Sequence, residues 1–364
     1  MAPRVRLGVI GAGSWAVSAH LPALKEMADE VELVGVSRLG PEALQRIKER
    51  FGFQVASEDY REVLDAGLDA VIVASPSAMH AEHARAALGA GAHVLCEKPF
   101  TITSADAWGI VEAAEEAGRH LLVSFGWNFK PMVEQAAQLL RHDGIGPIEH
   151  LSVTMSSQTR ELLMGTGAYP EADPETVPAE ETWTVPEISG GGYGQAQLSH
   201  ALALALGLTG ERVVGAFALM TVPPGRKVEL HDALSLRLAG GGIAAVGGAS
   251  SYVGADANKH HLVVEAVGGN GQFMVDVFRE RVSIFRPGRG ETALVLEPGE
   301  GAYDGSLAAR ALVDMVTGRR RANPAPGELG ARTVEALELA YASAASGRFE
   351  ARAPSGAAVG GGAR

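Results

Sequence analysis

Two short motifs in the sequence combine residue types that could do chemistry together. A G-x-G-x-x-A motif starts at Gly11, directly after an apolar run at residues 5–10, and a C-E-K-P motif at the end of a second apolar run finishes at Pro99. A glycine turn between a strand and a helix lets backbone amides approach a pyrophosphate. Pro99 favours an extended backbone at Lys98, so the lysine ammonium group would leave the end of its strand in a restricted direction.

The order of predicted elements places both motifs in one parallel sheet. The first third of the chain alternates strand and helix patterns, which is typical of a doubly wound α/β domain. Strands are predicted at residues 5–10, 32–36, 70–74, 92–96 and 120–125, and helices at 16–28, 41–51, 60–66, 81–90 and 104–117. Capping residues or prolines precede several of these helices, and glycines follow several of them. We therefore predict an N-terminal Rossmann domain at residues 1–125.

The pattern changes after Gly126. Helices are predicted at 131–141, 198–208, 305–317 and 328–346, and strands at 149–156, 234–238, 242–252, 262–268, 272–277 and 282–286. Glycine-rich turns between several of these strands indicate antiparallel pairing. We predict an α+β domain with a large, mostly antiparallel sheet at residues 126–352, followed by a tail at 353–364 that we expect to be disordered.

A connection at residues 159–189 interrupts the second domain. It is rich in proline and in acidic residues, namely Glu171, Asp173, Glu175, Glu180 and Glu181. We interpret it as a solvated loop, with a cover over a cleft as the alternative.

The composition excludes several classes of protein. The net charge is −12 over 364 residues, which argues against a nucleic-acid partner. A single cysteine, Cys96, excludes a disulfide framework and a cysteine-built metal site, so no metal is expected. The sequence offers no apolar stretch long enough to cross a bilayer and no signal-peptide pattern at its start. We expect a cytoplasmic protein with no membrane partner.

The predicted second strand indicates which nicotinamide nucleotide the glycine turn would hold. It ends in Val36-Ser37-Arg38, where NAD-binding domains usually carry an acidic residue. A hydroxyl and a guanidinium in that place favour a ribose 2′-phosphate, so we predict NADP in preference to NAD. Arg38 could instead stack on adenine or lie in solvent. The residues predicted to contact the cofactor in this half of the site are Gly11, Gly13, Ser14, Trp15, Ser37 and Arg38.

A longer pattern connects these motifs. It runs from D-A-V-I-V-A-S-P at residues 69–76 through His80 and A-L-x-A-G-x-H-V-L at residues 87–95, and it ends in C-E-K-P. This pattern closely resembles the Gfo/Idh/MocA family, the group of glucose–fructose oxidoreductase and inositol dehydrogenase. The resemblance is dense up to Pro99 and implies a nicotinamide-dependent oxidoreductase with a second, sheet-rich domain.

The resemblance also implies roles for individual residues. Lys98 would contact the reacting hydroxyl, and Glu97 would support Lys98 and the nicotinamide end. Ser75, Pro76 and His80 would border the cofactor, although His80 could equally cap or pack its helix. Partial burial and the like charge of an oxidised nicotinamide would lower the pKa of Lys98, which would help it to deprotonate an alcohol.

A second signature of the family is incomplete in this chain. The family pattern is a glycine run, then an Asp, then a His four residues later; here the run at 190–192 and His200 match, but the acid is replaced by Ala196. A spacing of four places both side chains on one helix face, so His200 lacks an anionic partner to raise its basicity. Gln197 could orient the ring without stabilising imidazolium. We predict Lys98 and His200 as catalytic residues, with more weight on Lys98 than is typical; a structural His200 is the alternative.

The substrate pocket is predicted from polar and aromatic positions. Substrate contacts are predicted at Asn128, Lys130, Tyr193, Gln195 and Gln197. Trp127 and Trp183 could offer flat faces to sugar C–H groups, with core packing as the alternative. His260 and His261 have no neighbours of metal-site type and are interpreted as structural.

The resemblance implies hydride transfer between a nicotinamide and a secondary hydroxyl or keto carbon. The substrate would be a sugar, glycoside or cyclitol, and the protein a homodimer or homotetramer. One alternative is an NAD-dependent glycosidase of the same fold without net redox change. Another is a non-catalytic cofactor-binding protein, which Ala196 makes more credible.

Overall fold

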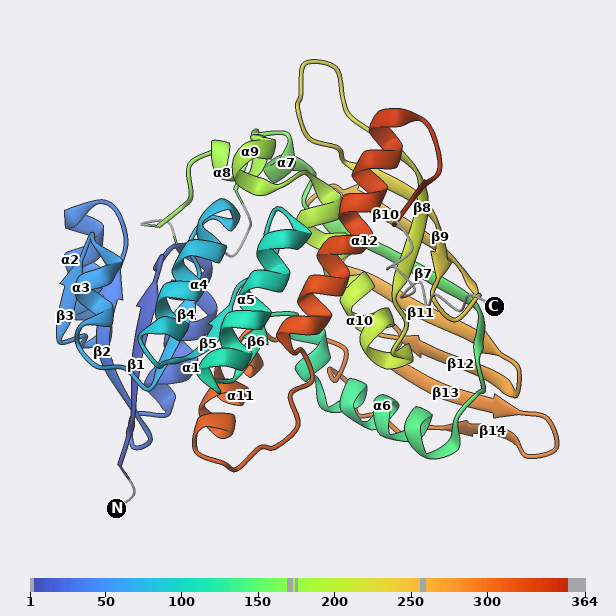
Figure 1. Ribbon diagram of the computed structural model, residues 1–364, viewed down its shortest axis with the longest axis horizontal. Helices are drawn as coiled ribbons and strands as arrows, with labels where there is room; N and C mark the ends of the chain where they lie inside the picture. Colours follow the sequence, from blue (N-terminus) through green and yellow to red (C-terminus); the bar gives the residue numbers. More distant parts are fainter. Residues whose placement is uncertain (1–2, 169–172, 174–175, 256–259, 353–364) are drawn as a thin grey trace, which may run out of the picture.

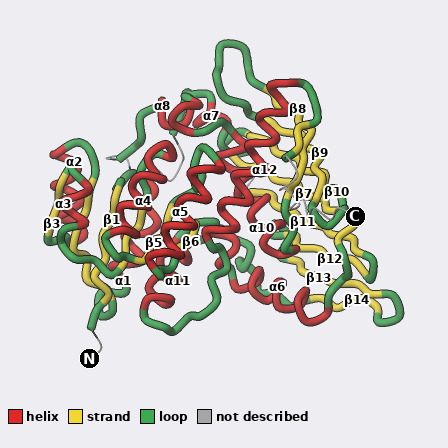
Figure 2. Tube along the Cα trace, viewed as in Figure 1, coloured by secondary structure: helices red, strands yellow, loops and turns green. Residues whose placement is uncertain are grey.

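The computed structural model describes residues 3–168, 173, 176–255 and 260–352. Two sheets dominate it, and they lie side by side along the long axis of the molecule (Figures 1 and 2). The predicted tail at 353–364 and two acids of the connection, Glu171 and Glu175, lie outside the described residues. No helix within the described residues is long and apolar enough to cross a membrane.

The first sheet has six parallel strands in the order β3-β2-β1-β4-β5-β6. The strands are β1 (Val5–Ile10), β2 (Val31–Ser37), β3 (Val55–Ser57), β4 (Ala70–Val73), β5 (His93–Cys96) and β6 (Leu121–Val123). Strand order reverses between β1 and β4, and in such sheets the ligand lies outside the carboxyl ends of the strands at that point. β1 and β4 are apolar and mostly buried, as expected of a parallel sheet with helices on both faces.

Helices connect these strands. They are α1 (Leu21–Glu26), α2 (Pro41–Phe51), α3 (Tyr60–Leu64), α4 (His80–Gly89) and α5 (Ser104–Ala117). Local sequence explains their ends: the Thr103 side chain accepts a hydrogen bond from the Asp106 amide at the start of α5, and Gly118 ends that helix in a left-handed conformation.

Two helices from the C-terminal part of the chain pack against the first domain. Helix α11 (Ser306–Val316) packs against β4, β5 and α1 (Figure 1). Helix α12 (Gly327–Ser346) packs against α5 on one side and against the second sheet on the other. The boundary at residues 125 and 126 stays a prediction, because the C-terminal third of the chain contacts both sheets.

The second sheet has nine strands in the order β14-β13-β12-β11-β7-β10-β9-β8-β15. The strands are β7 (Ile148–Gln158), β8 (Val213–Thr221), β9 (His231–Leu238), β10 (Ile243–Ser251), β11 (His260–Gly268), β12 (Gly271–Asp276), β13 (Arg281–Arg286), β14 (Gly290–Ala293) and β15 (Glu350–Ala351). Neighbours pair antiparallel except β7 and β10, which run parallel in the middle of the sheet. The fold class is confirmed: a Rossmann sheet plus an α+β domain with a mostly antiparallel sheet.

Helices cover one face of the second sheet. They are α6 (Pro131–Asp143), α10 (Ser199–Thr209) and α12. Helix α10 is apolar on nearly all sides and is buried between the sheet and α12, as its composition requires. The opposite face of the sheet exposes large apolar side chains, including Leu219 (65 % exposed) and Ile243 (58 %).

Three local features differ from the prediction. The predicted helix at 16–28 begins as a π-helical turn, Ala16–His20, and continues as α1. Strands β3, β8, β14 and β15 were not predicted. β3, β14 and β15 are only three, four and two residues long, whereas β8 lies between turn residues at Gly210 and Pro223 that could have marked it. The connection at 159–189 contains three one-turn helices, which are α7 (Arg160–Leu163), α8 (Glu181–Thr184) and α9 (Pro186–Ser189).

Candidate active site

A cavity of about 1150 Å³ lies at the carboxyl ends of β1, β2, β4 and β5. Its walls also include the start of α10 and residues of the acidic connection within 162–168 and 176–183, so both halves of the chain contribute. The cavity begins at the switch point between β1 and β4, where an open α/β sheet binds its ligand. We interpreted this connection as a solvated loop, with a cover over a cleft as the alternative. It forms one wall of the cavity, which agrees with the alternative.

The glycine turn at the end of β1 is shaped as a cradle. Gly11 has φ of +80°, and a Cβ there would lie 2.3 Å from the Cα atom of Ser75. A Cβ on Gly13 would have no neighbour nearer than 3.9 Å, because that residue faces the cavity. Ser14 and Trp15 continue the lining. Open space over Gly13, at the start of a helical segment, fits the pyrophosphate of a dinucleotide.

The end of β2 carries a guanidinium that pairs with no carboxylate among the described residues. Arg38 lines the cavity, and its hydrogen bonds go to the carbonyl oxygens of Leu39 (3.1 Å) and Ala12 (3.4 Å). Burial and the nearby Arg46 lower the pKa of Arg38 from its usual value. Ser37 lines the same wall, and its hydroxyl lies 3.5 Å from the Glu58 carbonyl oxygen.

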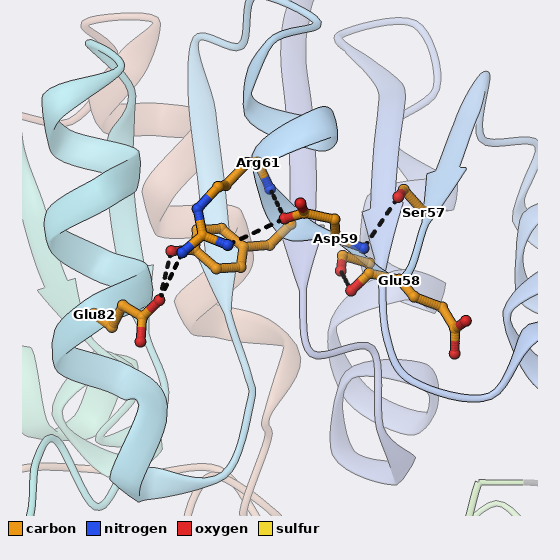
Figure 3. Close-up of polar contacts among 7 residues, drawn as sticks. Ser57, Glu58, Asp59, Arg61 and Glu82 are labelled. Atoms are coloured by element: carbon orange, nitrogen blue, oxygen red, sulfur yellow. Dashed lines mark hydrogen bonds and ion pairs between the residues drawn. The ribbon is translucent and has the colours of Figure 1, made fainter.

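Acidic side chains near the carboxyl end of β2 already have hydrogen-bond or ion-pair partners (Figure 3). Asp59 accepts a hydrogen bond from the Arg61 amide at 3.0 Å and thereby caps α3. The Arg61 guanidinium reaches Glu82 at 3.2 Å and lies over the Tyr60 ring, 4.5 Å from its centroid. The Glu58 carboxylate accepts a hydrogen bond from the Gly40 amide at 2.6 Å.

Lys98 connects the two sheets across the cavity. The peptide bond between Lys98 and Pro99 is cis, and the lysine Nζ donates a hydrogen bond to the carbonyl oxygen of Ala196 at 2.9 Å. Burial lowers the pKa of Lys98, and the adjacent Glu97 partly offsets this effect. The amine is therefore held at one place in the cavity wall and is easier to deprotonate than a solvated lysine.

Glu97 is buried behind the lysine and is fully engaged. Its Oε2 accepts a hydrogen bond from the Lys98 amide at 3.0 Å, and its Oε1 lies 2.7 Å from Nε2 of His20. Burial alone would raise the pKa of Glu97, but His20, Ser124 and Lys98 hold it below its usual value. Glu97 is thus a fixed negative charge beside Lys98.

His200 enters the cavity from α10 among aromatic rings. Its ring centroid lies 5.1 Å from that of Trp127, 5.7 Å from that of Tyr303 and 6.0 Å from that of Phe125. The buried Nδ1 atom has no hydrogen-bond partner among the described residues. Burial, with Lys98 and His260 nearby, lowers the pKa of His200 well below its usual value, so the ring is neutral.

Comparison with known proteins agrees with this geometry. Residues 5–125 match the model of an oxidoreductase family with an NAD-binding Rossmann fold, GFO_IDH_MocA. The match to the Gfo/Idh/MocA oxidoreductase family therefore covers the Rossmann domain, which is about a third of the chain.

Curated relatives match over about two fifths of the chain. D-xylose 1-dehydrogenase (NADP(+)) 2 of Haloferax volcanii is 32% identical over 134 residues, which are 36% of this chain and 41% of the relative. Myo-inositol 2-dehydrogenase of Thermotoga maritima is 31% identical over 151 residues, 41% of this chain and 45% of the relative. The chain thus spans less than half the length of these relatives.

Solved structures match nearly the whole chain. The oxidoreductase domain protein from Kribbella flavida gives a TM-score of 0.78 at 20% identity and covers 96% of this chain and 99% of its own. Levoglucosan dehydrogenase in complex with NADH and levoglucosan gives a TM-score of 0.77 at 21% identity, with the same coverage. At this identity the likeness shows the fold alone, and it extends through both sheets.

The structure brings most of the predicted site residues together. Those that line the cavity are Gly11, Gly13, Ser14, Trp15, Ser37, Arg38, Ser75, Pro76, Glu97, Lys98, Gln197 and His200, together with Trp127 and Trp183.

His80 lies just behind the cavity wall. Its Nε2 is 2.7 Å from the Ser75 carbonyl oxygen, and its Nδ1 is 2.8 Å from that of Pro99. Burial lowers the pKa of His80 although both carbonyls oppose this effect. The ring therefore braces two wall segments against each other rather than bordering the cavity.

Four predicted substrate residues do not line the cavity. Asn128 donates to the carbonyls of Ala203 and Pro324, and Lys130 is buried at the start of α6. The Tyr193 hydroxyl lies 2.8 Å from the Ser157 hydroxyl, under the second sheet. The Gln195 side chain is buried beside Gly190. Of these four residues, only Gln195 lies in the π-helical turn Gly194–Leu198, which directs only part of its surface to the cavity.

Sequence reasoning missed three residues of this region. His20 contacts Glu97, while His260 and Tyr303 line the cavity and flank Trp127, with ring centroids 5.1 Å and 4.6 Å from its own. His260 had been interpreted as structural. No local signal marks these residues, because each reaches the site from a distant segment of the chain.

Proposed function

We propose that this chain is an NAD(P)-dependent dehydrogenase. It transfers a hydride between the nicotinamide and a carbon that bears a secondary hydroxyl in a sugar, glycoside or cyclitol. The observation that carries this proposal is the meeting of Lys98, from the end of β5, with His200, from α10, in a cavity whose other end is the glycine turn.

The described residues divide into two groups along the cavity. Gly11, Gly13 and Ser14 would hold the pyrophosphate, and Ser75 and Pro76 would border the nicotinamide half. When bound, the nicotinamide supplies the hydride acceptor or donor. Lys98 and His200 would orient the hydroxyl and take or return its proton.

The adenosine end supports a preference for NADP. Arg38 and Arg46 repel each other, Arg38 pairs with no described carboxylate, and Glu58 and Asp59 are engaged with backbone amides. A ribose 2′-phosphate would supply the missing anion. The relative from Haloferax volcanii carries NADP(+) in its name, whereas levoglucosan dehydrogenase was solved with NADH.

The proposal also includes the oligomeric state and the cellular location of the protein. The exposed apolar face of the second sheet, around Leu219 and Ile243, supports a homodimer or homotetramer. A cytoplasmic location is part of the same proposal and is supported by the single, buried cysteine.

A titration of NADPH and NADH followed by tryptophan fluorescence, together with a turnover screen of sugars and cyclitols, tests the proposal. We expect NADPH to bind at least about tenfold more tightly than NADH, and Arg38→Ala to remove this difference while NADH binding is kept. Turnover should depend on added nucleotide. Turnover without added nucleotide would favour the redox-neutral glycosidase, and failure to bind either nucleotide would refute the proposal.

A further inference from the structure

The family's acidic position is occupied by Ala196, and a backbone group acts in its place. Residues Gly194–Leu198 form a π-helical turn, whose hydrogen bonds skip one residue further than in an α-helix. The Ala196 carbonyl in this turn accepts the hydrogen bond from Lys98 at 2.9 Å. A carbonyl has two lone pairs, so it can hold the lysine in addition to its helical partner.

Burial lowers the pKa of Lys98, but the charge of its protonated form is partly compensated. The Ala196 carbonyl accepts one of its three N–H bonds, and the carboxylate of Glu97 is the neighbouring side chain. Glu97 is itself kept ionised by His20. An ammonium group formed at this place therefore has both a hydrogen-bond acceptor and a compensating negative charge.

The protonated form of His200 has neither a hydrogen-bond acceptor at Nδ1 nor a compensating negative charge. Its Nδ1 has no hydrogen-bond partner among the described residues, and the rings of Phe125, Trp127 and Tyr303 surround it. The titratable groups that interact with it are Lys98 and His260, and both would repel an imidazolium. A proton delivered to this ring would stay uncompensated in an apolar surrounding.

We propose that Lys98 carries the proton in catalysis and that His200 acts as a neutral hydrogen-bonding partner of the substrate. In the oxidising direction the Lys98 amine takes the hydroxyl proton, the hydride leaves the same carbon for the oxidised nicotinamide, and the C–O bond becomes C=O. Reduction reverses each transfer. This assignment rests on the proposed function, and it exchanges the roles that the complete family signature would suggest.

Three variants separate the two roles by activity. Lys98→Met removes the proton carrier and should lower kcat/KM by about a thousandfold. Lys98→Arg keeps the positive charge but cannot give up its proton, so it should be equally poor. His200→Gln keeps a hydrogen-bonding group and should lose no more than about tenfold, with the pH profile of kcat/KM unmoved.

A second measurement does not depend on turnover. Histidine-selective NMR of the cofactor-free protein, assigned with His200→Gln, should show the His200 ring staying neutral at pH values well below the usual range for histidine, because burial lowers its pKa. Ala196→Asp should raise the pKa of that ring by about one unit or more, whereas Ala196→Asn, of equal size, should not.

The results distinguish the possibilities. Activity of Lys98→Arg near that of wild type, or a loss in His200→Gln as large as in Lys98→Met, would overturn the proposal. A His200 ring that titrates above pH 6 would do the same. If the wild-type protein turned over no substrate, the proposed function would fail, and the NMR titration would still decide whether His200 can hold a proton.

Discussion

Nε2 of His20 lies 2.7 Å from Oε1 of Glu97, and both side chains are almost completely buried. His20 ends the π-helical turn that follows the glycine cradle, and Glu97 directly follows β5 and precedes Lys98. The contact therefore connects the segment after the glycine cradle to the segment that carries Lys98.

Removal of one partner of this pair should destabilise the protein strongly. His20→Ala leaves the Glu97 carboxylate buried with fewer donors, and the free energy of unfolding should fall by about 3 kcal/mol. Urea denaturation at pH 7 measures this loss. The double variant His20→Leu with Glu97→Met buries no charge and should recover part of the stability while activity is lost. Equal stability of the single variant and the wild type would show that the pair contributes nothing.

The two glycines of the cradle should respond differently to alanine. Gly13→Ala meets no atom nearer than 3.9 Å, so the fold should persist while the methyl group occupies the place of the pyrophosphate. Nucleotide affinity should fall by about tenfold or more with an unchanged Tm. Gly11→Ala places a methyl group 2.3 Å from the Ser75 backbone at φ of +80°, and Tm itself should drop. Calorimetry with and without NADPH measures both effects, and unchanged affinity in Gly13→Ala would contradict the assignment of the cradle.

Asp232 should make the protein less stable as pH rises. Both of its carboxylate oxygens are buried without a hydrogen-bond partner among the described residues, and burial together with Glu229 raises its pKa to about 8. Between pH 4 and 8 the folded state keeps a proton that the unfolded state has lost. Stability should therefore fall by up to about 1.4 kcal/mol per pH unit over this range.

Asp232→Asn removes this titration. The variant should exceed the wild type in stability by about 2 kcal/mol or more at pH 7, and the difference should shrink toward pH 4. Asp276 offers a matched control, because it is equally buried but paired with Arg279 at 2.9 Å. Asp276→Asn should destabilise instead. Parallel pH profiles of Asp232→Asn and wild type would contradict the expected protonation.

Glu335 joins the two halves of the molecule. On α12, it accepts hydrogen bonds from Trp108 of α5 (2.7 Å) and from Arg212, which precedes β8 (2.8 and 3.0 Å). Burial raises its pKa, but Arg212 and Trp108 outweigh this effect and hold the pKa below its usual value. The stabilisation is therefore present at neutral pH and is lost as pH falls through the acidic range.

Glu335→Ala should lower the free energy of unfolding by about 3 kcal/mol at pH 7, because Trp108 and Arg212 lose their acceptor. Glu335→Gln keeps an acceptor and should lose less. Denaturation at pH 7 and pH 3 is the measurement, and the difference between wild type and Glu335→Ala should narrow at pH 3. A difference that is the same at both values would exclude an ionised Glu335 as its source.

The sequence by itself determined the local elements of the first sheet. Alternating apolar runs, glycine stops and capping residues are short-range signals, so β1, α2 and α5 have the predicted bounds. The same holds for the motifs at strand ends, Gly11 and Lys98, because parallel strands bring their carboxyl ends to one edge of a sheet. The resemblance to the Gfo/Idh/MocA family followed from these motifs, and the family model matches residues 5–125.

Only the tertiary structure decided which residues from distant segments of the chain reach the site. His20, His260 and Tyr303 reach the site through packing of segments far apart in the sequence, which no local pattern encodes. The π-helical turn before α10 decided that Gln197 and His200 face the cavity while Tyr193 faces the second sheet. A register change of one residue rotates a helix face by about 100°, so sequence spacing could name the candidates but could not orient them. The partner of Lys98 is a backbone carbonyl, a group that every residue carries, and only the folded chain could show which one it is.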